Sequence, residues 1–331
     1  MSPPDTSRAS ASTVEDRENV RCNFCHADDF DVLVGDGRDR RHHLPGEFRM
    51  VRCRKCGLVY LNPRPTAEAL AAYYPPDYSP YTQRGLFGKL TRWLRQREAA
   101  SLRRSLPPGA EVLEVGCAGG DLLVPMREAG LRVTGVELSE HAATIARTRH
   151  NLDVYTGSLA DAPLAGRTFD AVIMRSVIEH VPDPRGDLEK AASLLRPGGL
   201  LSLRTDNVAS SDARLFGSMW YGFDFPRHLT LFSPQTLTAF VRSAGLEVTR
   251  VRFSLVPTHW IVSLGYWASE RKALASVSRL LSPRNPLLLG LGFGIAAVQS
   301  VLHDSGRFMV LARKPMSGAT TAPNPEQHPE R

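Results

Sequence analysis

The chain has 331 residues, 42% of them hydrophobic and 23% charged, which is a globular composition that can build a large core and excludes a peptide hormone or a disulfide knot. The formal net charge is +7, from 41 Lys and Arg against 34 Asp and Glu. This mild and dispersed excess of positive charge suits an anionic substrate or a membrane surface and does not by itself indicate nucleic acid.

The two ends of the chain differ in composition from the rest. Residues 1–20 and 315–331 are rich in Pro, Ser, Thr and charged residues, and we expect both segments to be disordered. Residues 1–20 also lack the apolar core of a signal peptide, so we expect a cytoplasmic protein.

Four of the five cysteines form two Cys-x-x-Cys pairs, Cys22 with Cys25 and Cys53 with Cys56. This pairing argues against a secreted disulfide framework and for a metal site in a reducing compartment. Two such knuckles at the ends of a short hairpin make a tetrahedral thiolate cage, which predicts a zinc ribbon over residues 21–65; buried free cysteines are the alternative. Four thiolates fill the coordination sphere, so the zinc should be structural. Three nearby histidines are therefore expected at the surface: His26, His42 and His43.

The middle of the chain reads as a short helical segment followed by an α/β domain. Residues 66–108 are predicted to be a helical linker, with helices over Ala67–Tyr74 and Leu86–Leu106. Residues 109–314 alternate short apolar runs with helical segments, which is typical of a parallel sheet with helices on both faces. Seven strands are expected: Glu111–Val115, Arg132–Glu137, Asp153–Thr156, Phe169–Met174, Leu200–Thr205, Glu247–Phe253 and Arg307–Arg313.

One helix, between the fifth and the sixth expected strand, carries clear sequence signals at both of its ends. Ser233 fits an N-cap, Pro234 the first helical position, and Gly245 the residue past the end.

The last two strands are separated by a helical insertion at about residues 254–306, far longer than a normal connection. Its run Asn285–Leu302 is uncharged, but a single membrane crossing would leave the last strand on the wrong side of the bilayer. A peripheral membrane contact, aided by Trp260 and by the basic amphipathic stretch Phe87–Arg104, is one interpretation. A lid over the substrate pocket and a homodimer contact are the others.

The most informative motif runs from Glu111 to Asp121, where an apolar strand enters a glycine-rich turn that opens a helix. Gly116 and Gly120 allow close approach of a ligand to the backbone. The second strand ends at Glu137, twenty-one residues after Gly116, where an acid can accept both hydroxyls of a ribose. The alternative is a structural turn beside a surface glutamate.

These residues resemble the class I S-adenosylmethionine-dependent methyltransferases. An acid, Glu114, lies two residues before the first glycine, and the turn is Gly-Cys-Ala-Gly-Gly. Three further stretches match the family: Phe169–Pro184, Leu194–Leu201 and Ala244–Val248. The resemblance covers roughly residues 86–314 and implies a Rossmann-like, seven-stranded class I sheet and S-adenosylmethionine as cofactor.

The resemblance also implies roles for single residues. Glu114 and Gly116 would line the methionine and ribose end of the cofactor, with Gly120 in the same turn. Glu137 would hold the ribose hydroxyls, and Leu138 would lie against the adenine.

At three positions the chain departs from the family or invites another interpretation. Ser158 stands where an acid often contacts the adenine amino group, and Ala118 replaces the middle glycine of the turn. Cys117, in the same turn, is expected to be a small packing residue and not a nucleophile.

Methyl transfer needs an oriented acceptor and, for a hydroxyl or carbon acid, a base. Glu179 and His180 follow the fourth strand, and His228, next to Arg227, lies in an aromatic-rich segment after the fifth. We expect the general base among these three residues, Glu179, His180 and His228; the alternatives are a structural histidine and a pair that only caps its loop. Metal-assisted O-methyltransferases carry a further acid at the position of Ser176, so no catalytic metal is expected.

The cysteine pairs and the following Leu61–Pro65 resemble the zinc-domain-bearing sugar C-methyltransferases, although no room remains for their additional C-terminal domain. The leading hypothesis is methylation of a small molecule, such as a sugar, a glycan precursor or a secondary metabolite. A methyltransferase that binds RNA or protein through the ribbon and a non-catalytic cofactor-binding scaffold are the alternatives. The ribbon has no long Lys/Arg run with interleaved aromatics, so nucleic acid is not the expected partner.

Overall fold

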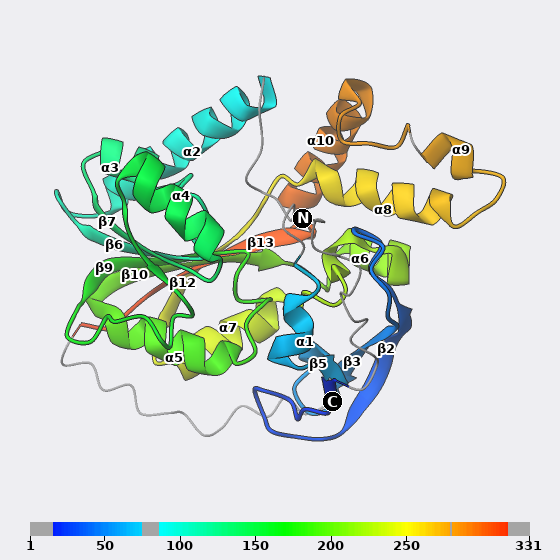
Figure 1. Ribbon diagram of the computed structural model, residues 1–331, viewed down its shortest axis with the longest axis horizontal. Coiled ribbons are helices and arrows are strands. Elements are labelled where there is room, and N and C mark those ends of the chain that lie inside the picture. The colour runs from blue at the N-terminus through cyan, green and yellow to red at the C-terminus, as the bar shows by residue number, and fades with distance from the viewer. Residues whose placement is uncertain (1–15, 75–85, 279, 317–331) are drawn as a thin grey trace, which may run out of the picture.

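The computed structural model describes residues 16–74, 86–278 and 280–316 (Figure 1). Its centre is a seven-stranded mixed sheet in the order β12-β13-β10-β9-β6-β7-β8. The strand β13 runs antiparallel between β10 and β12, and the pairs among the other five strands are parallel. The strands are β6 (Glu111–Val115), β7 (Arg132–Glu137), β8 (Asp153–Thr156), β9 (Phe169–Arg175), β10 (Leu195–Asp206), β12 (Glu247–Phe253) and β13 (Arg307–Arg313). This is the α/β Rossmann-like fold that the sequence predicted.

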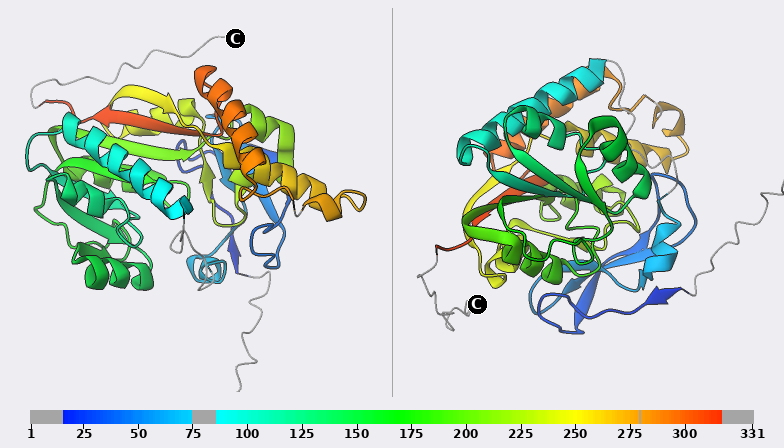
Figure 2. Two further views of the ribbon diagram at one scale, coloured as in Figure 1. Left: turned by 90° about the horizontal axis from the view of Figure 1, so that it is seen from above. Right: turned by 60° about the vertical axis from the view of Figure 1, so that its left-hand side comes forward.

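Helices cover both faces of the sheet (Figures 1 and 2). Successive residues of a strand point to opposite faces, so Val112 joins one core and Leu113 the other. The first face is covered by α2 (Leu86–Ser105), α3 (Leu123–Glu128) and α4 (Glu140–His150). The second face is covered by α5 (Pro184–Leu194) and α7 (Pro234–Ser243).

Element ends follow the sequence signals closely, with local exceptions. Helix α7 begins with Ser233 as N-cap in a reciprocal capping box with Thr236, and Gly245 lies past its end with a φ of +77°. Strand β10 begins at Leu195 instead of Leu200, with a register shift between these two residues. Helix α1 (Ala67–Ala71) ends before Tyr74, where the prediction extended it.

The N-terminal region is not a freestanding unit. Its strands β2 (Phe30–Gly37), β3 (Phe48–Cys53) and β4 (Val59–Leu61) form a four-stranded sheet that β11 (Thr230–Leu231) of the larger domain completes. Phe24 stacks on Phe240 of α7 with ring centroids 4.6 Å apart. The predicted ribbon therefore shares a core with the methyltransferase-like domain.

One expectation of disorder is corrected at its edge. Arg17 and Glu18, expected in a disordered segment, form β1 (Arg17–Glu18) and pair with β5 (Arg64–Pro65). Arg64 also contacts Glu18 through an ion pair of 2.7 Å, which adds to the backbone pairing. Of the two expected disordered ends, residues 1–15 and 317–331 lie outside the described residues.

The insertion between β12 and β13 contains three helices, α8 (Pro257–Ser269), α9 (Ala275–Ser278) and α10 (Pro286–Val301). Helices α8 and α10 pack against each other through Gly292, where an added Cβ would lie 3.0 Å from Pro257. The chain then returns to the central sheet as β13.

No helix among the described residues combines the length and the apolar character needed to cross a bilayer.

A fully buried arginine connects the N-terminal region to the larger domain. Both Nη atoms of Arg227 donate to Asp39 of the loop after β2, at 2.7 and 3.0 Å, and Nη2 also donates to Asp224 at 2.8 Å. The side chains of Arg227 and Asp39 are completely buried. Burial raises the pKa of the Asp224 carboxyl, but the hydrogen bond from Arg227 and the positive charges around it together lower that pKa to about 2.

We expect Arg227→Met to lower the free energy of unfolding by about 3–5 kcal/mol, because the variant keeps two buried carboxylates and removes their cation. Chemical denaturation at neutral pH measures this loss. The matched control is Arg54→Met, which removes an exposed ribbon ion pair and should change stability little. Since the folded pKa of Asp224 lies below the ordinary 3.8, its contribution is present above about pH 4 and is lost as the pH falls toward 2. A wild-type-like unfolding curve for the Arg227 variant would contradict this account.

Candidate functional site

The glycine turn after β6 is held by packing that leaves no room for larger residues. Gly116 and Gly120 have φ values of +69° and +87°. A Cβ on Gly116 would lie 2.3 Å from Val177, and one on Gly120 would lie 2.3 Å from Leu152. Ala118, which replaces a family glycine, also adopts a positive φ of +51°, so the substitution keeps the shape of the turn. Helix α3 begins only at Leu123, later than the sequence suggested.

Glu137 closes the same turn from β7. One carboxylate oxygen accepts from the Ala118 N–H at 2.8 Å, and the other accepts from the Ser139 N–H at 2.9 Å. Each oxygen keeps a second lone pair, which a diol could use. The next residue, Leu138, is 75% exposed, an unusual position for a large apolar side chain beside a turn.

Glu114 is fully buried beneath the turn, and Arg175 at the end of β9 pairs with it at 2.8 Å. Arg175 also contacts Glu98 of α2 at 3.2 Å. The second oxygen of Glu114 has no hydrogen-bond partner in the described part of the chain. Burial raises the pKa of this carboxyl, with Arg175 acting against that rise. An orphaned carboxylate oxygen here fits a cationic or N–H-bearing ligand group.

The contacts of Ser158 and Cys117 indicate what each of these two predicted residues does. The Ser158 hydroxyl donates to the carboxylate of Asp161 at 2.5 Å, so an acid does follow the third strand of the fold, one turn later than the family places it. Cys117 is buried, and its sulfur occupies the space that a Cβ on Gly135 would fill, at 2.5 Å. Burial raises the pKa of its thiol, which keeps the group protonated and favours the packing role.

The fold brings the three candidate base residues together. Glu179, His180 and His228 place one ligand-type atom each within 4.8 Å of the others, and the rings of the two histidines meet edge to face at 4.6 Å. The Glu179 carbonyl accepts from the Leu229 and Thr230 N–H groups at 2.7 and 3.1 Å. These two bonds fix the segment that carries His228 against the loop after β9.

Hydrogen bonds to carbonyl oxygens define the proton positions on both histidines. His228 Nδ1 lies 2.7 Å from the Gly222 carbonyl, and His180 Nδ1 lies 3.1 Å from the Arg227 carbonyl. A carbonyl only accepts, so each Nδ1 carries the proton and each neutral ring keeps a lone pair on Nε2. The hydroxyl of Tyr74 also lies 3.1 Å from His180 Nδ1.

The surroundings of the three candidate residues favour the neutral form of some ionisable side chains and the charged form of others. Burial lowers the pKa of His180 to about 3, and the nearby His228 adds to that shift, so His180 is neutral at physiological pH. Burial raises the pKa of Glu179, whose carboxylate oxygens are both buried with no hydrogen-bond partner among the described residues. Asp206, at the end of β10, is ionised: burial raises the pKa of its carboxyl, but the charge and hydrogen bond of Arg307, together with the nearby histidines, lower that pKa below its ordinary value.

A Glu-His-His cluster with free Nε2 atoms is also a metal-ligand set in principle. The position three residues before Glu179 is Ser176 and supplies no carboxylate.

The four paired cysteines converge in space. Cys22 Sγ lies 3.4 Å from Cys56 Sγ, and Cys25 Sγ lies 3.5 Å from Cys53 Sγ. All four sulfurs lie within 4.8 Å of one another. A tetrahedral zinc with bonds of about 2.3 Å would separate its sulfurs by about 3.8 Å, so the cluster fits that ion.

The two knuckles repeat the same backbone bonds. The N–H of His26 donates to the Cys22 carbonyl, and that of Gly57 donates to the Cys53 carbonyl, both at 2.9 Å. His26 adopts a φ of +58° and Gly57 a φ of +76°. His26 thus takes the turn position that Gly57 fills in the second knuckle, and its ring contacts Arg185 instead of the sulfurs.

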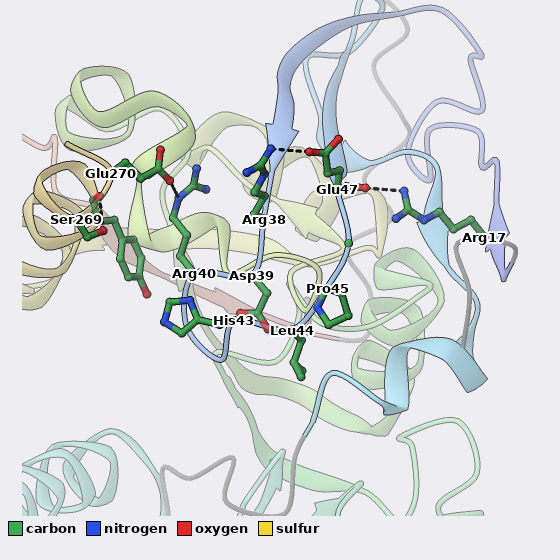
Figure 3. A pocket seen from close by; sticks show the side chains of 12 residues that line it. Arg17, Arg38, Asp39, Arg40, His43, Leu44, Pro45, Glu47, Ser269 and Glu270 are labelled. Atoms are coloured by element: carbon green, nitrogen blue, oxygen red, sulfur yellow. Dashed lines mark hydrogen bonds and ion pairs between the residues drawn. The ribbon is translucent and has the colours of Figure 1, made fainter. Parts of the chain in front are cut away.

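A cavity of about 790 Å³ lies elsewhere, between the loop after β2 and the end of α8 (Figure 3). None of the residues predicted for the cofactor or the base lines it. Three of its arginines are held by acceptors: Arg17 by the Glu47 carbonyl, Arg38 by the Glu47 carboxylate and Arg40 by Glu270. Its wall includes Asp39, which bonds to the Arg227 side chain, and the Arg227 carbonyl in turn lies 3.1 Å from His180 Nδ1.

Sequence reasoning missed several polar residues of this region. Arg175, Tyr74 and Asp206 contact or neighbour the predicted residues but belong to no motif of their own. The charged ends of the apolar runs were the available signal, since Arg175 and Asp206 each terminate a strand of the sheet.

Comparison with known families decides the class of this protein. A family model described as a methyltransferase domain matches residues 83–251. The chain belongs to the methyltransferase domain family. The predicted family and its sheet are therefore confirmed.

Curated relatives of this methyltransferase are similar over part of the chain. A ubiquinone biosynthesis O-methyltransferase of Xanthomonas axonopodis pv. citri is 36% identical over 159 residues, which are 44% of this chain and 66% of the relative. The enzyme of the same name from Aromatoleum aromaticum is 35% identical over 172 residues, 47% of this chain and 73% of the relative. The chain thus spans about two thirds of the length of these relatives.

Solved structures with a similar fold include a possible histamine N-methyltransferase of Thermotoga maritima, with 21% identity and a TM-score of 0.43 over 68% of this chain and 92% of that one. Magnesium protoporphyrin IX methyltransferase of Synechocystis with bound SAH gives 16% identity and a TM-score of 0.44 over 74% and 92%.

Proposed function

We propose that this protein transfers a methyl group from S-adenosylmethionine to a small-molecule acceptor, with His228 as the general base. The main support for this role of His228 is the 2.7 Å contact from its Nδ1 to the Gly222 carbonyl. It keeps the ring in the tautomer whose Nε2 can take a proton.

The glycine turn and its neighbours would hold the cofactor. The orphaned oxygen of Glu114 suits its amino group, and the remaining lone pairs of Glu137 suit the ribose hydroxyls. Leu138 offers an exposed apolar surface for the adenine, and Asp161, oriented by Ser158, offers an acceptor for its amino group. When bound, S-adenosylmethionine supplies an activated methyl group on a sulfonium centre.

Topology supports a single crevice for cofactor and base. The glycine turn follows β6, and the Glu179-His180 pair follows the adjacent parallel strand β9, so both lie at the same carboxyl edge of the sheet. Gly116 packs directly on Val177, two residues before Glu179. His228 would take the acceptor's proton, while neutral His180 and the buried Glu179 shape the pocket around it.

The acceptor is proposed to be a small molecule methylated on oxygen. The support comes from the names of the relatives, which are O-methyltransferases of ubiquinone biosynthesis. A sugar or glycan precursor remains the second candidate, favoured by the four-cysteine region.

We further propose that the cysteine cluster holds one structural zinc. The support is the sulfur spacing and the matched pair of knuckles. Cys22 and Cys53 are buried in the core that joins the ribbon to the larger domain. The metal would therefore stabilise the surface on which β11 docks.

Glu137→Ala should weaken S-adenosylmethionine binding by about 1–3 kcal/mol, because the ribose hydroxyls lose their acceptor in a partly buried site. Isothermal titration calorimetry measures the dissociation constant. Glu140→Ala, at the exposed first residue of α4, is the matched control and should bind normally. An unchanged constant for the Glu137 variant, with its fold intact, would count against the assignment.

Protein purified without added metal should contain one zinc per chain. Cys56→Ser should lose the zinc, because the cage then lacks a thiolate, while Cys117→Ser should keep it. Elemental analysis and thiol titration of the native protein provide the readout. Less than half an equivalent of zinc, with four freely titrating thiols, would exclude the ribbon.

His228→Ala should lower turnover by about 10²–10⁴-fold and leave cofactor affinity nearly unchanged, since the ring acts on the acceptor's proton. His303→Ala, an exposed histidine of the insertion, is the control. Turnover and melting temperature are measured on one preparation of each variant. A loss of stability without a loss of turnover would transfer the base assignment to His180 or Glu179.

A further inference from the structure

Helix α10 of the insertion exposes its large apolar side chains and buries its small and polar ones. From Asn285 to Leu302 the sequence contains no charged residue. Its inward side is small or polar, with Gly292, Ala296 and Gln299 buried. Its outward side consists of large apolar residues: Leu287, Leu291, Phe293, Val298, Val301 and Leu302. A surface helix in water shows the opposite arrangement, so another body covers this face.

The degree of exposure is high for such residues. Leu287 is 83% exposed and Val301 is 78% exposed. Meanwhile Gln299, the strongest hydrogen-bonding side chain of the helix, points inward and bonds to Ser211 and Asp212 at 2.8 and 3.2 Å. These bonds fix the rotation of α10, so the helix cannot turn its leucines into the core.

A basic helix lies on the same side of the molecule. Helices α2 and α10 both occupy the upper side in Figure 1 and both face the viewer in the left view of Figure 2. On α2, Trp93 and Leu94 are about half exposed, and Arg97 places its guanidinium 4.7 Å from the centre of the Trp93 ring. Arg284, just before α10, is also exposed. Basic residues beside exposed tryptophan and leucine are typical of a surface that lies in a lipid interface.

The size of the face distinguishes a lipid surface from a second copy of the chain. Helix α10 has 16 residues, so it is about 24 Å long and about 10 Å wide. Its face therefore offers about 250 Å², well below the roughly 800 Å² per partner that a stable protein interface buries. A bilayer needs no complementary shape, and anionic headgroups complement the basic residues of α2.

We propose that α10 and the exposed part of α2 form a peripheral docking surface for an anionic membrane. Helix α10 would lie in the plane of the interface with its leucines among the acyl chains, and the arginines of α2 would contact the headgroups. The proposal does not depend on the methyl-transfer chemistry.

The test is co-sedimentation of the full chain with vesicles of phosphatidylcholine alone or with added phosphatidylglycerol. The protein should bind the anionic vesicles, and binding should weaken as salt is raised. The double variant Leu291→Asp/Val298→Asp should reduce the partition coefficient by about tenfold or more. Arg97→Glu should reduce binding to anionic vesicles only. Val32→Asp, at an apolar ribbon residue that is also about half exposed, is the matched control and should bind as the wild type does.

Analytical ultracentrifugation of the same variants completes the test. Circular dichroism and the melting temperature first establish that each variant folds. No vesicle binding by the folded wild type, or equal binding by the double variant, would overturn the proposal. Self-association of the wild type that the double variant loses, without vesicle binding, would show that the face is an interface between copies.

Discussion

The arrangement of the candidate site depends on Arg227. Its guanidinium is fully buried, bonds to Asp39 and Asp224, and also donates to the Tyr73 carbonyl at 3.1 Å. Its own carbonyl accepts from His180. One residue thus joins the N-terminal region, the start of the helical linker and the loop after β9. Burying this cation with its carboxylates costs desolvation energy. The resulting ion pairs hold the segment that carries His228 in one position.

Burial disfavours the charged form of every ionisable side chain around the candidate site, and ion pairs stabilise the charged form of some of them. His180 and Glu179 are pushed toward their neutral forms, whereas Asp206 keeps its charge because Arg307 donates to it at 2.7 Å. Glu114 differs: burial raises the pKa of its carboxyl even though Arg175 pairs with it beneath the glycine turn. The acidic and basic groups that remain charged are therefore those already paired inside the protein. His228, the proposed base, makes no hydrogen bond through Nε2 within the described part of the chain, so that in the proposed reaction this atom could accept a proton.

Much of the fold was predictable because its signals are local. Glycines in a tight turn, Ser233 as an N-cap and runs of apolar residues each act within a few positions, and the strand bounds follow them. The cluster of Glu179, His180 and His228 was predicted as a set of candidates but not as a contact. Its contact depends on β11 pairing with β4, a long-range event that no local pattern encodes. Tyr74 and Arg175 escaped for the same reason, since their partners lie far away in sequence.

Hydrogen bonds and close packing of buried polar groups connect the insertion to the end of β10. Gln299 of α10 bonds to Asp212, which accepts from Trp220 at 2.8 Å. His259 of α8 lies 3.6 Å from Asp212 and 3.5 Å from Asp206. The rotation that exposes the leucines of α10 is thus the one that turns the Gln299 amide toward Ser211 and Asp212. Asp212 in turn lies against His259, which lies against Asp206 at the carboxyl end of β10. The same buried polar groups therefore hold both the orientation of the exposed apolar face and the position of the insertion on the central sheet.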